Sequence, residues 1–443
     1  MKKNIGIILL LALSGQAAFS QIDLKISLKE AQELGLKNRS DVKADALRLE
    51  ASRIEKQKAK QAWLPEISAN ANVSYHPQLQ ATLIPAGFVP GLNEPQILAL
   101  GAKSISIYSL ELNQPILKAT LSSDVKLAKN SEAMEAEKKR GRDIVVKQQI
   151  SQAYLNTQLK DLQWRLAKQD ENRFFKYYQV AEGKFKSGAL IENEYLRAKL
   201  DYENACHQTT TSLQSLGLSI KSLRYELNVD TLVKLILTDS IDVNPVVLPA
   251  IQEDITLARN RTEIKQLQLQ READELNEKK QRQSVMPVIS LYGNYAQQFL
   301  NGNFNYDYSN SRWWSPFSSV GLKLSLPITG QLTNRTKVQQ SRLRSQETIL
   351  RQEQQTAKVN YEIRQSTTEI ANAIQNVRRA DNSFKLAQRV YENQEKQLAL
   401  GAFSYDSLLN TESSVLNAER NYIKSVYDYF ISRLNYEIAI GGL

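Results

Sequence analysis

The sequence predicts a mostly α-helical chain that contains one structural unit twice, each repeat pairing long helices with a β-hairpin. Three observations predict this class. Short motifs recur at nearly constant offsets along the 443 residues. The chain is rich in Gln, Lys, Glu, Ala and Leu but holds only 17 Gly and 11 Pro, a composition typical of long helices. Apolar residues near the C-terminus return every seven positions, which indicates a coiled-coil seam.

Residues 1–20 have the pattern of a secretory signal peptide. A basic start precedes a short apolar run from Ile5 to Leu13, and Ala18-Phe19-Ser20 resembles a cleavage site. The run is too short to span a membrane, and a buried N-terminal helix is the alternative interpretation. Cys206 is the single cysteine and lies far from the cleavage point, so we expect neither a lipid anchor nor an intramolecular disulfide.

Hydropathy and charge exclude several classes of protein. No segment after residue 20 approaches 18 consecutive apolar residues, so we expect no transmembrane helix. The formal net charge is +10, but the charges are spread along helices, which favours solvated helix faces over a nucleic-acid-binding patch. The two histidines and one cysteine have no metal-site spacing, and no Gly-rich phosphate loop is present. The sequence therefore predicts no catalytic, cofactor-binding or metal site.

The internal repeat is visible in the sequence itself. The matched positions are Asn38 and Asn260, Pro65 and Pro287 (222 apart), Pro115 and Pro327 (212 apart), and Gly188 and Gly401 (213 apart). The main change of offset, from 222 to 212, falls between the two prolines of each repeat. A loop is the element that tolerates such a difference in length.

Each repeat is expected to contain the same elements in the same order. A helix begins at Ser40 or Thr262 and stops at the first proline, because proline disfavours helix at the residue before it. Alternating residues then predict β-hairpins at about 66–113 and 288–326, whose second strands end at the second proline of each repeat. A helix of roughly 100 Å follows, at about 1.5 Å per residue, and turns back at a glycine.

These elements divide the chain into repeat 1 at 21–227 and repeat 2 at 251–443. Residues 228–250 between them are interpreted as a linker, in which the alternation of Leu232, Lys234 and Ile236 is compatible with a short strand. Residues 76–103, inside the first hairpin, contain four prolines and are expected to form a long loop.

The long helix of repeat 2 has the most regular pattern in the chain. Its seven-residue series is Ile363, Ile370, Val377, Phe384, Tyr391 and Leu398, with Ala373, Ala380 and Ala387 in the companion position. Repeat 1 keeps only part of the series, at Ile150, Trp164, Tyr178 and Phe185. A seam of large residues facing small ones predicts close helix pairing.

Four strands in one chain are too few to close a barrel, for which about eight are the usual minimum. Open strand edges cannot face lipid, so other chains would have to complete the sheet. Three chains would give a 12-stranded transmembrane β-barrel, with their helices forming a coiled-coil cylinder. Closure alone does not fix the number three.

The order helix, proline, β-hairpin, proline, long helix, glycine turn and returning helix, all of it repeated, resembles the TolC family of outer-membrane efflux proteins. Leu28, Glu30 and Ala31 also resemble the opening of the family, although Arg39 stands where its members commonly have proline. The resemblance covers essentially all of the chain after the signal peptide. It implies a homotrimer in outer-membrane lipid, with a helical tunnel in the periplasm.

The resemblance also implies a function and partners. Members of the family are passive exit ducts that dock onto a periplasmic adaptor (membrane fusion) protein and an inner-membrane pump, in tripartite efflux or type I secretion. We therefore expect a non-enzymatic channel, for small molecules or metal ions ahead of proteins. A periplasmic coiled-coil adaptor or scaffold is the alternative, but adaptors usually have one hairpin and many Gly- and Pro-rich strands.

Two glycine turns are expected to form the tip of the helical part. The resemblance makes Gly188, Ala189, Gly401 and Ala402 candidate adaptor contacts. The glycines also suffice as helix breakers, and the two roles can coexist.

Four residues beside these turns are candidates for the tunnel entrance and gate. Glu192, Glu194 and Asp406 would form a ring of acids in a trimer, which favours cations. Phe403 stands where the family pattern has an arginine, so an apolar constriction is expected in place of an ionic latch. The alternative is that the acids are solvated residues at helix N-termini.

Aromatic residues gather before and within the last predicted strand. Trp313, Trp314 and Phe317 are expected to lie at the membrane interface, where aromatic side chains form girdles. A packed loop core is the alternative interpretation.

Overall fold

The computed structural model describes residues 23–88, 90–91, 93–99, 101–230, 233–239, 260–302, 308–309, 311–399 and 405–442. The predicted signal peptide and most of the predicted linker lie outside these residues. The chain divides into two compact units. Unit 1 comprises Met1–Asp45, Arg140–Arg261 and Lys358–Leu443, and unit 2 comprises Ala46–Lys139 and Thr262–Ala357.

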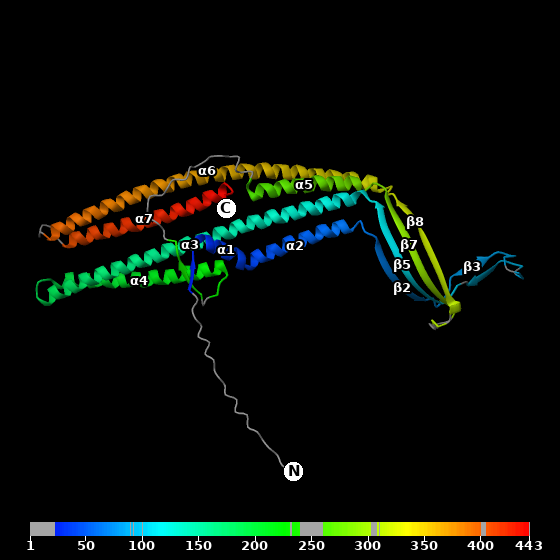
Figure 1. Cartoon of the computed structure of the whole chain (residues 1–443), viewed down its shortest axis with the longest axis horizontal. Coiled ribbons are helices and arrows are strands. Elements are labelled where there is room, and N and C mark those ends of the chain that lie inside the picture. The colour runs from blue at the N-terminus through cyan, green and yellow to red at the C-terminus, as the bar shows by residue number, and fades with distance from the viewer. Residues whose placement is uncertain are drawn as a thin grey trace, which may run out of the picture. The chain divides into compact units, whose positions relative to one another are not determined.

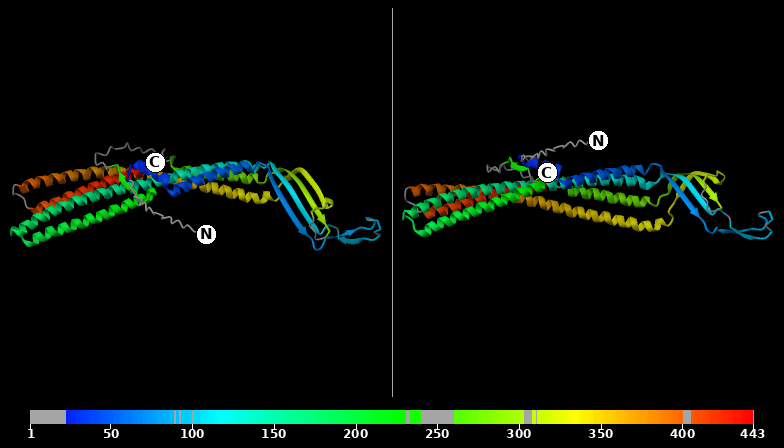
Figure 2. Two further views of the ribbon diagram at one scale, coloured as in Figure 1. Left: turned by 60° about the horizontal axis from the view of Figure 1, so that its bottom comes forward. Right: turned by 90° about the horizontal axis from the view of Figure 1, so that it is seen from below.

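Seven α-helices make up most of the described residues (Figure 1). They are α1 (Leu28–Asn38), α2 (Ser40–Gln61), α3 (Ala119–Lys186), α4 (Glu192–Leu227), α5 (Thr262–Gln283), α6 (Gly330–Ala399) and α7 (Tyr405–Ala439). In unit 1, α4 runs beside the second half of α3, and α7 runs beside the second half of α6 (Figures 1 and 2). No helix in the described part of the chain is both long and apolar enough to cross a membrane.

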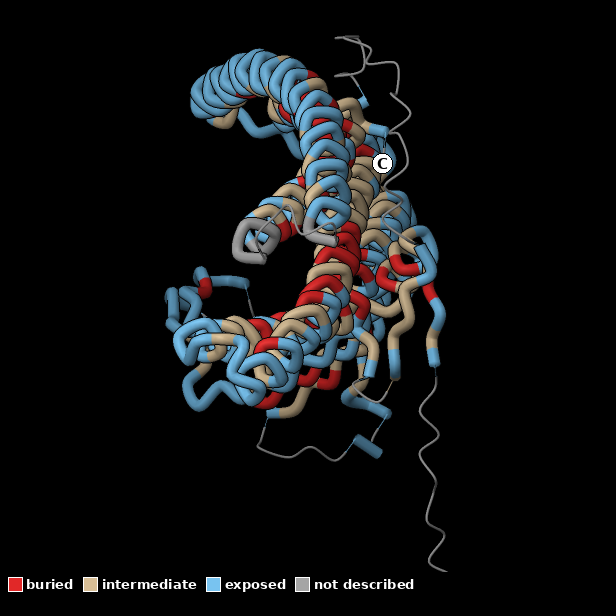
Figure 3. The backbone as a smooth tube through the Cα atoms, turned by 90° about the vertical axis from the view of Figure 1, so that its left-hand side faces the viewer, coloured by how far each residue is buried: buried red, intermediate tan, exposed pale blue. Residues whose placement is uncertain are grey.

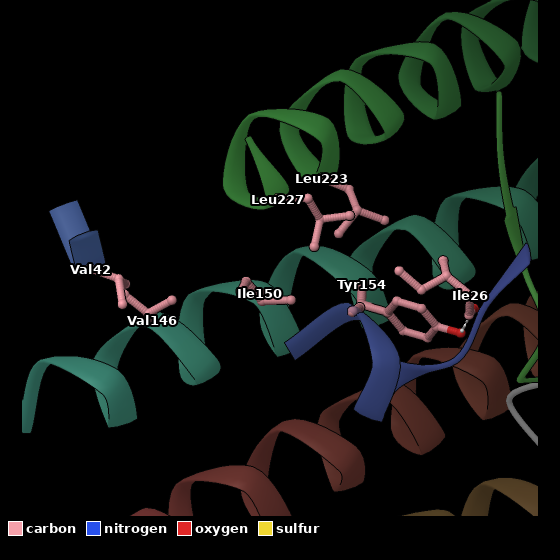
Figure 4. Packing of buried hydrophobic residues seen from close by; sticks show 8 residues of the cluster. Ile26, Val42, Val146, Ile150, Tyr154, Leu223 and Leu227 are labelled. Carbon is pink, nitrogen blue, oxygen red and sulfur yellow. Dashed lines mark hydrogen bonds between the residues drawn. The ribbon is translucent and has the colours of Figure 1, made fainter. Parts of the chain in front are cut away.

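The first core of unit 1 lies where α1 and α4 meet α3 (Figure 4). Ile150 and Tyr154 of α3 are fully buried against Leu223 and Leu227 of α4. The Tyr154 hydroxyl donates to the carbonyl of Ile26 at 3.0 Å, which satisfies its polar group inside an apolar cluster. Gly35 lets α1 approach closely, since a Cβ atom there would lie 2.1 Å from Ile150 Cδ1.

The second core of unit 1 is the predicted coiled-coil seam. Ile363, Ile370 and Val377 of α6 are all buried, and the last two pack with Tyr422 and Val426 of α7. Figure 3 shows buried residues interspersed with exposed ones along the helices. The seven-residue spacing therefore marks the packed face of α6, as expected for knobs-into-holes packing.

In each repeat, an arginine next to the start of a helix donates a hydrogen bond to a side chain of the long helix. Arg39 Nη1 donates to Gln149 Oε1 at 3.0 Å and to Glu226 at 2.5 Å. Arg261 Nη2 donates to Glu362 Oε2 at 3.0 Å. Gln149 and Glu362 are 213 positions apart, so the internal repeat extends to a tertiary contact.

A four-stranded antiparallel sheet, in the order β2-β5-β7-β8, belongs to unit 2. Its strands are β2 (Glu66–Tyr75), β5 (Ser104–Leu117), β7 (Val288–Asn301) and β8 (Trp314–Ser325). β5 continues past Pro115, where we expected it to end, because a register shift between Pro115 and Leu117 accommodates the proline.

The chain has more strands than the four predicted. β3 (Ala81–Ile84) and β4 (Gln96–Ala99) form an antiparallel hairpin inside the segment interpreted as a loop, because its prolines flank these strands rather than interrupt them. β1 (Asp23–Ile26) pairs in parallel with β6 (Lys234–Leu237), which places a short strand in the predicted linker. Both strands of this pair contribute apolar side chains to the first core.

Candidate functional site

The turn between α3 and α4 is closed by backbone hydrogen bonds around Gly188. The Ala189 N–H donates to the Lys184 carbonyl at 2.8 Å, and the Gly188 N–H donates to the Phe185 carbonyl at 3.0 Å. This is the Schellman pattern of a helix C-terminus, and it explains the positive φ of 72° at Gly188. A Cβ atom on Gly188 would meet nothing within 4 Å, so the backbone conformation is what requires glycine.

Glu192 and Glu194 lie in the first turn of α4, and both are exposed. The residue before the helix, Ile191, makes no side-chain capping bond. The two acids therefore complement the positive end of the helix dipole. Gly401, Ala402 and Phe403 lie outside the described residues. Asp406 lies in α7, at a position where only the backbone is described.

A stack of aromatic rings runs along the end of the α3–α4 hairpin, and sequence reasoning missed it as a unit. Phe185 and Tyr195 stack with ring centroids 5.0 Å apart, and Tyr178 and Tyr202 stack at 5.8 Å. Tyr178 also lies 6.0 Å from Tyr195, and Phe175 lies 5.2 Å from Tyr202. The available signal was the seven-residue spacing of Tyr178 with Phe185 and of Tyr195 with Tyr202, one pair on each helix.

A buried ionic network links α3 of repeat 1 to α7 of repeat 2, and no sequence motif predicted it. Arg173 Nη2 donates to Asp170 Oδ1 at 2.5 Å, and Arg173 Nε forms an ion pair with Glu412 Oε1 at 2.9 Å. Arg420 Nη2 lies 3.2 Å from Asp170 Oδ2. Glu412 is only 1% exposed, so its charge depends on this partner rather than on water.

Burial dominates the electrostatics of this network. It raises the pKa of the Asp170, Glu412 and Glu419 carboxyls above their ordinary values, although Arg173 opposes the shift at all three. The carboxyls of the network thus lie in poorly solvated places, whereas the Arg173 and Arg420 side chains that face them keep 34% and 51% of their surface exposed.

The two faces of the sheet differ sharply in chemistry. Cross-strand register and strand alternation place Ile67, Leu110, Tyr295 and Val320 on one face. These side chains are exposed in the single chain, Val320 to 77%. The opposite face is mostly polar, with Ser68, Asn70, Glu111, Asn294, Ser319 and Lys323. An amphipathic sheet results, whose apolar face is exposed except near the start of β8, where Tyr308 packs against Phe299 and Trp314.

The predicted interface aromatics are only partly brought together. Trp314, the first residue of β8, packs with Tyr108, Phe299 and Tyr308 at centroid distances of 5.4–6.0 Å. Its Nε1 donates to the Tyr308 carbonyl at 3.0 Å.

The other two predicted aromatics lie apart from this cluster. Trp313 is the last residue of η2 (Ser311–Trp313) and is 42% exposed. Strand alternation places Phe317 on the polar face, opposite Trp314. Sequence reasoning missed Tyr108, which lies 206 positions from Trp314, and it also missed Phe299, which lies in the first strand of the same hairpin as Trp314.

In the described residues no group of three or more His, Cys, Asp or Glu side chains is placed to hold a metal ion.

Solved structures of known proteins share this fold. CusC superposes with a TM-score of 0.75 at 16% identity, covering 98% of this chain and 96% of that chain. The CmeC outer membrane channel of Campylobacter jejuni gives 0.72 at 18% identity, covering 94% and 85%. The MtrE outer membrane channel of Neisseria gonorrhoeae gives 0.70 at 15% identity, covering 94% and 89%. At these identities the likeness establishes the fold.

A search of curated proteins finds no match. The family model for outer membrane efflux proteins matches residues 32–224 and 256–442, which are most of both repeats. The matched segments contain the helices, the four-stranded sheet and the turn at Gly188 described above. The chain therefore belongs to the outer membrane efflux protein family, whose members are channel proteins of the outer membrane rather than enzymes.

Proposed function

We propose that this chain is the exit duct of a tripartite efflux or type I secretion system. Three subunits would contribute four strands each to a closed twelve-stranded sheet in the outer membrane. Their long helices would surround one passage in the periplasm. The duct is a passive conduit, which receives substrate from an inner-membrane pump through a periplasmic adaptor and performs no chemistry of its own.

The observation that carries the proposal is the amphipathic four-stranded sheet. Its apolar face is stable against lipid, whereas in water it would leave a large exposed apolar patch. Its polar face suits a water-filled passage. The end strands β2 and β8 each have one neighbour in the sheet, and backbone groups at a free edge must be paired when they meet lipid. Pairing between subunits meets that need.

Membrane fractionation and conductance test the proposal together. We expect the protein in the outer-membrane fraction as an oligomer that dissociates on heating in detergent. The purified oligomer should give discrete channel openings in a planar bilayer. Recovery as a soluble periplasmic protein would favour an adaptor or scaffold and contradict the proposal.

The cargo class in this proposal is small molecules or metal ions ahead of secreted proteins. A strain that lacks the gene should become more sensitive to drugs or metal ions, and complementation should restore resistance. A strain that instead loses an extracellular protein would move the assignment to type I secretion.

The adaptor contact is proposed at the two glycine turns, Gly188-Ala189 and Gly401-Ala402. The exposed backbone at Gly188, with open space around it, supports access by a partner. Ala189→Trp should lower cross-linking to the adaptor and raise drug or metal sensitivity. Gly183→Ala, also in open space but within α3, is the matched control and should do neither.

The entrance is proposed to be lined by Glu192, Glu194 and Asp406 and narrowed by Phe403. Glu192 and Glu194, the acids in the first turn of α4, support a preference of the entrance for cations. Phe403→Ala should raise the closed-state conductance in planar bilayers, since it would remove an apolar constriction. Unchanged closed-state conductance would remove Phe403 from this role and leave the duct assignment in place.

A further inference from the structure

The β3–β4 hairpin is a small sheet whose apolar face has no cover in the described chain. Register places Leu83 and Ile97 directly opposite each other, on one face with Ala81 and Ala99. Leu83 is 63% exposed and Ile97 is 72% exposed, and Phe88 in the turn is exposed as well. An isolated two-stranded hairpin is at best marginally stable in water, so a partner on this face would stabilise it.

The chemistry of the hairpin indicates the kind of partner. Between residues 76 and 103 the only formal charges are those of Glu94 and Lys103. A nearly uncharged, apolar surface matches another apolar surface and offers little to a charged partner.

The position of the hairpin narrows the choice further. The hairpin leaves β2 at Tyr75, and the His76 N–H donates to the Lys103 carbonyl at 2.7 Å to close its base. β3 and β4 project from the end of the sheet at which β2 finishes (Figures 1 and 2). Because β2 is an end strand of the sheet, the hairpin stands at the edge where a neighbouring subunit would join.

Strand direction determines what a neighbour would present there. The four strands alternate in direction, and continuing that alternation sets β8 of the next subunit antiparallel to β2. The end of β2 at Tyr75 then lies beside the start of β8, which Trp313 directly precedes. Within one chain, Trp313 adjoins β8 and the hairpin adjoins β2. These two strands are three strand spacings, or about 14 Å, apart. Between subunits, β2 of one chain and β8 of the next would be neighbouring strands, one spacing or about 4.8 Å apart.

We propose that the β3–β4 hairpin of one subunit packs against the exposed Trp313 side chain of the next subunit, using the face that carries Leu83 and Ile97. We call this contact between the hairpin and Trp313 the clasp, and one clasp would form at each junction between subunits. It adds side-chain burial to the strand pairing between β2 and β8. This inference rests on the proposed oligomeric duct, and it assigns the hairpin a partner within that assembly.

Disulfide trapping tests the clasp in the full-length protein, in a Cys206→Ser background. The test pair is Ile97→Cys with Trp313→Cys. The matched control is Thr82→Cys with Trp313→Cys, since Thr82 lies on the opposite face of the same hairpin. A reference series joins Asn70→Cys on β2 to cysteines at Ser315, Ser319 and Lys323 on β8, all on the polar face.

We expect the Ile97 pair to cross-link subunits several-fold more than the Thr82 pair, with at least one reference pair also linked. A linked reference series with no preference for Ile97 over Thr82 would overturn the clasp and leave the duct standing. Failure of the whole reference series would contradict the duct, and the clasp with it.

Two further measurements test the clasp without relying on cross-linking. Leu83→Asn combined with Ile97→Asn should lower the temperature at which the oligomer dissociates, whereas Thr82→Asn should not. Bimane attached at Ile97→Cys should be poorly quenched in vesicles of brominated phosphatidylcholine. Strong quenching would assign this face to lipid and overturn the clasp.

Discussion

The buried ionic network is the residue-scale feature that joins the two repeats. Arg173 forms ion pairs with Asp170 on its own helix and with Glu412, 239 positions later in the sequence. Removing one member of a buried pair leaves an uncompensated charge, and such losses typically cost several kcal/mol. The network therefore specifies which faces of α3 and α7 meet.

The network also predicts a pH dependence. Because the pKa of Glu412 is raised in the folded state, the native protein holds more protons than the unfolded chain between the ordinary and the raised pKa. Its contribution to stability is complete below the ordinary pKa and is lost as the pH rises through the raised one. Glu412→Gln should flatten that part of the curve of melting temperature against pH, measured by circular dichroism.

Glu278→Gln provides a control with the opposite sign. Arg282 and Arg342 lower the pKa of Glu278, so its contribution is present above the ordinary pKa and is lost as the pH falls. The two variants should thus change the pH curve in opposite senses. Parallel curves for Glu412→Gln and wild type would contradict the role of burial at Glu412.

Gly35 predicts a second residue-scale effect. Gly35→Ala would bring its new methyl group against Ile150, which is fully buried and has little room to move. We expect a loss of about 1–3 kcal/mol in unfolding free energy by chemical denaturation. Gly217→Ala in α4, where a Cβ atom meets nothing within 4 Å, should be neutral or stabilising. Equal effects at the two sites would contradict the close approach of α1 to α3.

At the scale of elements, the two helical hairpins differ more than their shared order suggests. The aromatic stack belongs to repeat 1 alone. The positions of repeat 2 that correspond to Phe175, Phe185, Tyr195 and Tyr202 hold Gln388, Leu398, Leu408 and Val415. The regular apolar seam belongs to repeat 2, so each hairpin is stabilised by a different set of side chains.

The stack predicts that the hairpin end of repeat 1 depends on its aromatic rings. Phe185→Ala removes the ring that stacks on Tyr195, and such pairs contribute about 0.5–1.5 kcal/mol beyond area burial. Amide hydrogen exchange at Ser187 to Ile191 should become faster. Tyr225→Ala, at a highly exposed residue of α4, should leave this exchange unchanged. Unchanged exchange in both variants would show that the turn holds without the stack.

Much of the element order could be predicted because it depends on local chemistry. Pro65 and Pro287 end helices, Gly188 permits a left-handed turn, and seven-residue spacing marks a seam, all within a few residues of the effect. The β1–β6 pair could not be predicted, since its strands lie more than 200 residues apart and each has four residues. The contact of Trp314 with Tyr108 and the Asp170 network were missed for the same reason, because each joins segments more than 200 residues apart.

At the scale of the whole molecule, the single chain carries a sheet that is incomplete by itself. The apolar face needs lipid, and the end strands β2 and β8 need partners. Both needs are met if subunits join edge to edge and the ring closes. The family assignment fixes the outer membrane as the setting, and a closed ring of three subunits is the central claim to test.

Disulfide trapping between β2 and β8 tests that claim most directly, using Asn70→Cys and Ser319→Cys with Cys206→Ser in intact cells. After oxidation, the outer-membrane fraction is separated on a non-reducing gel. The proposed duct predicts covalent dimers and trimers, with trimers as the largest species because the ring closes. A ladder that continues beyond three subunits, or no intersubunit link at any of the paired positions scanned along β8, would contradict it.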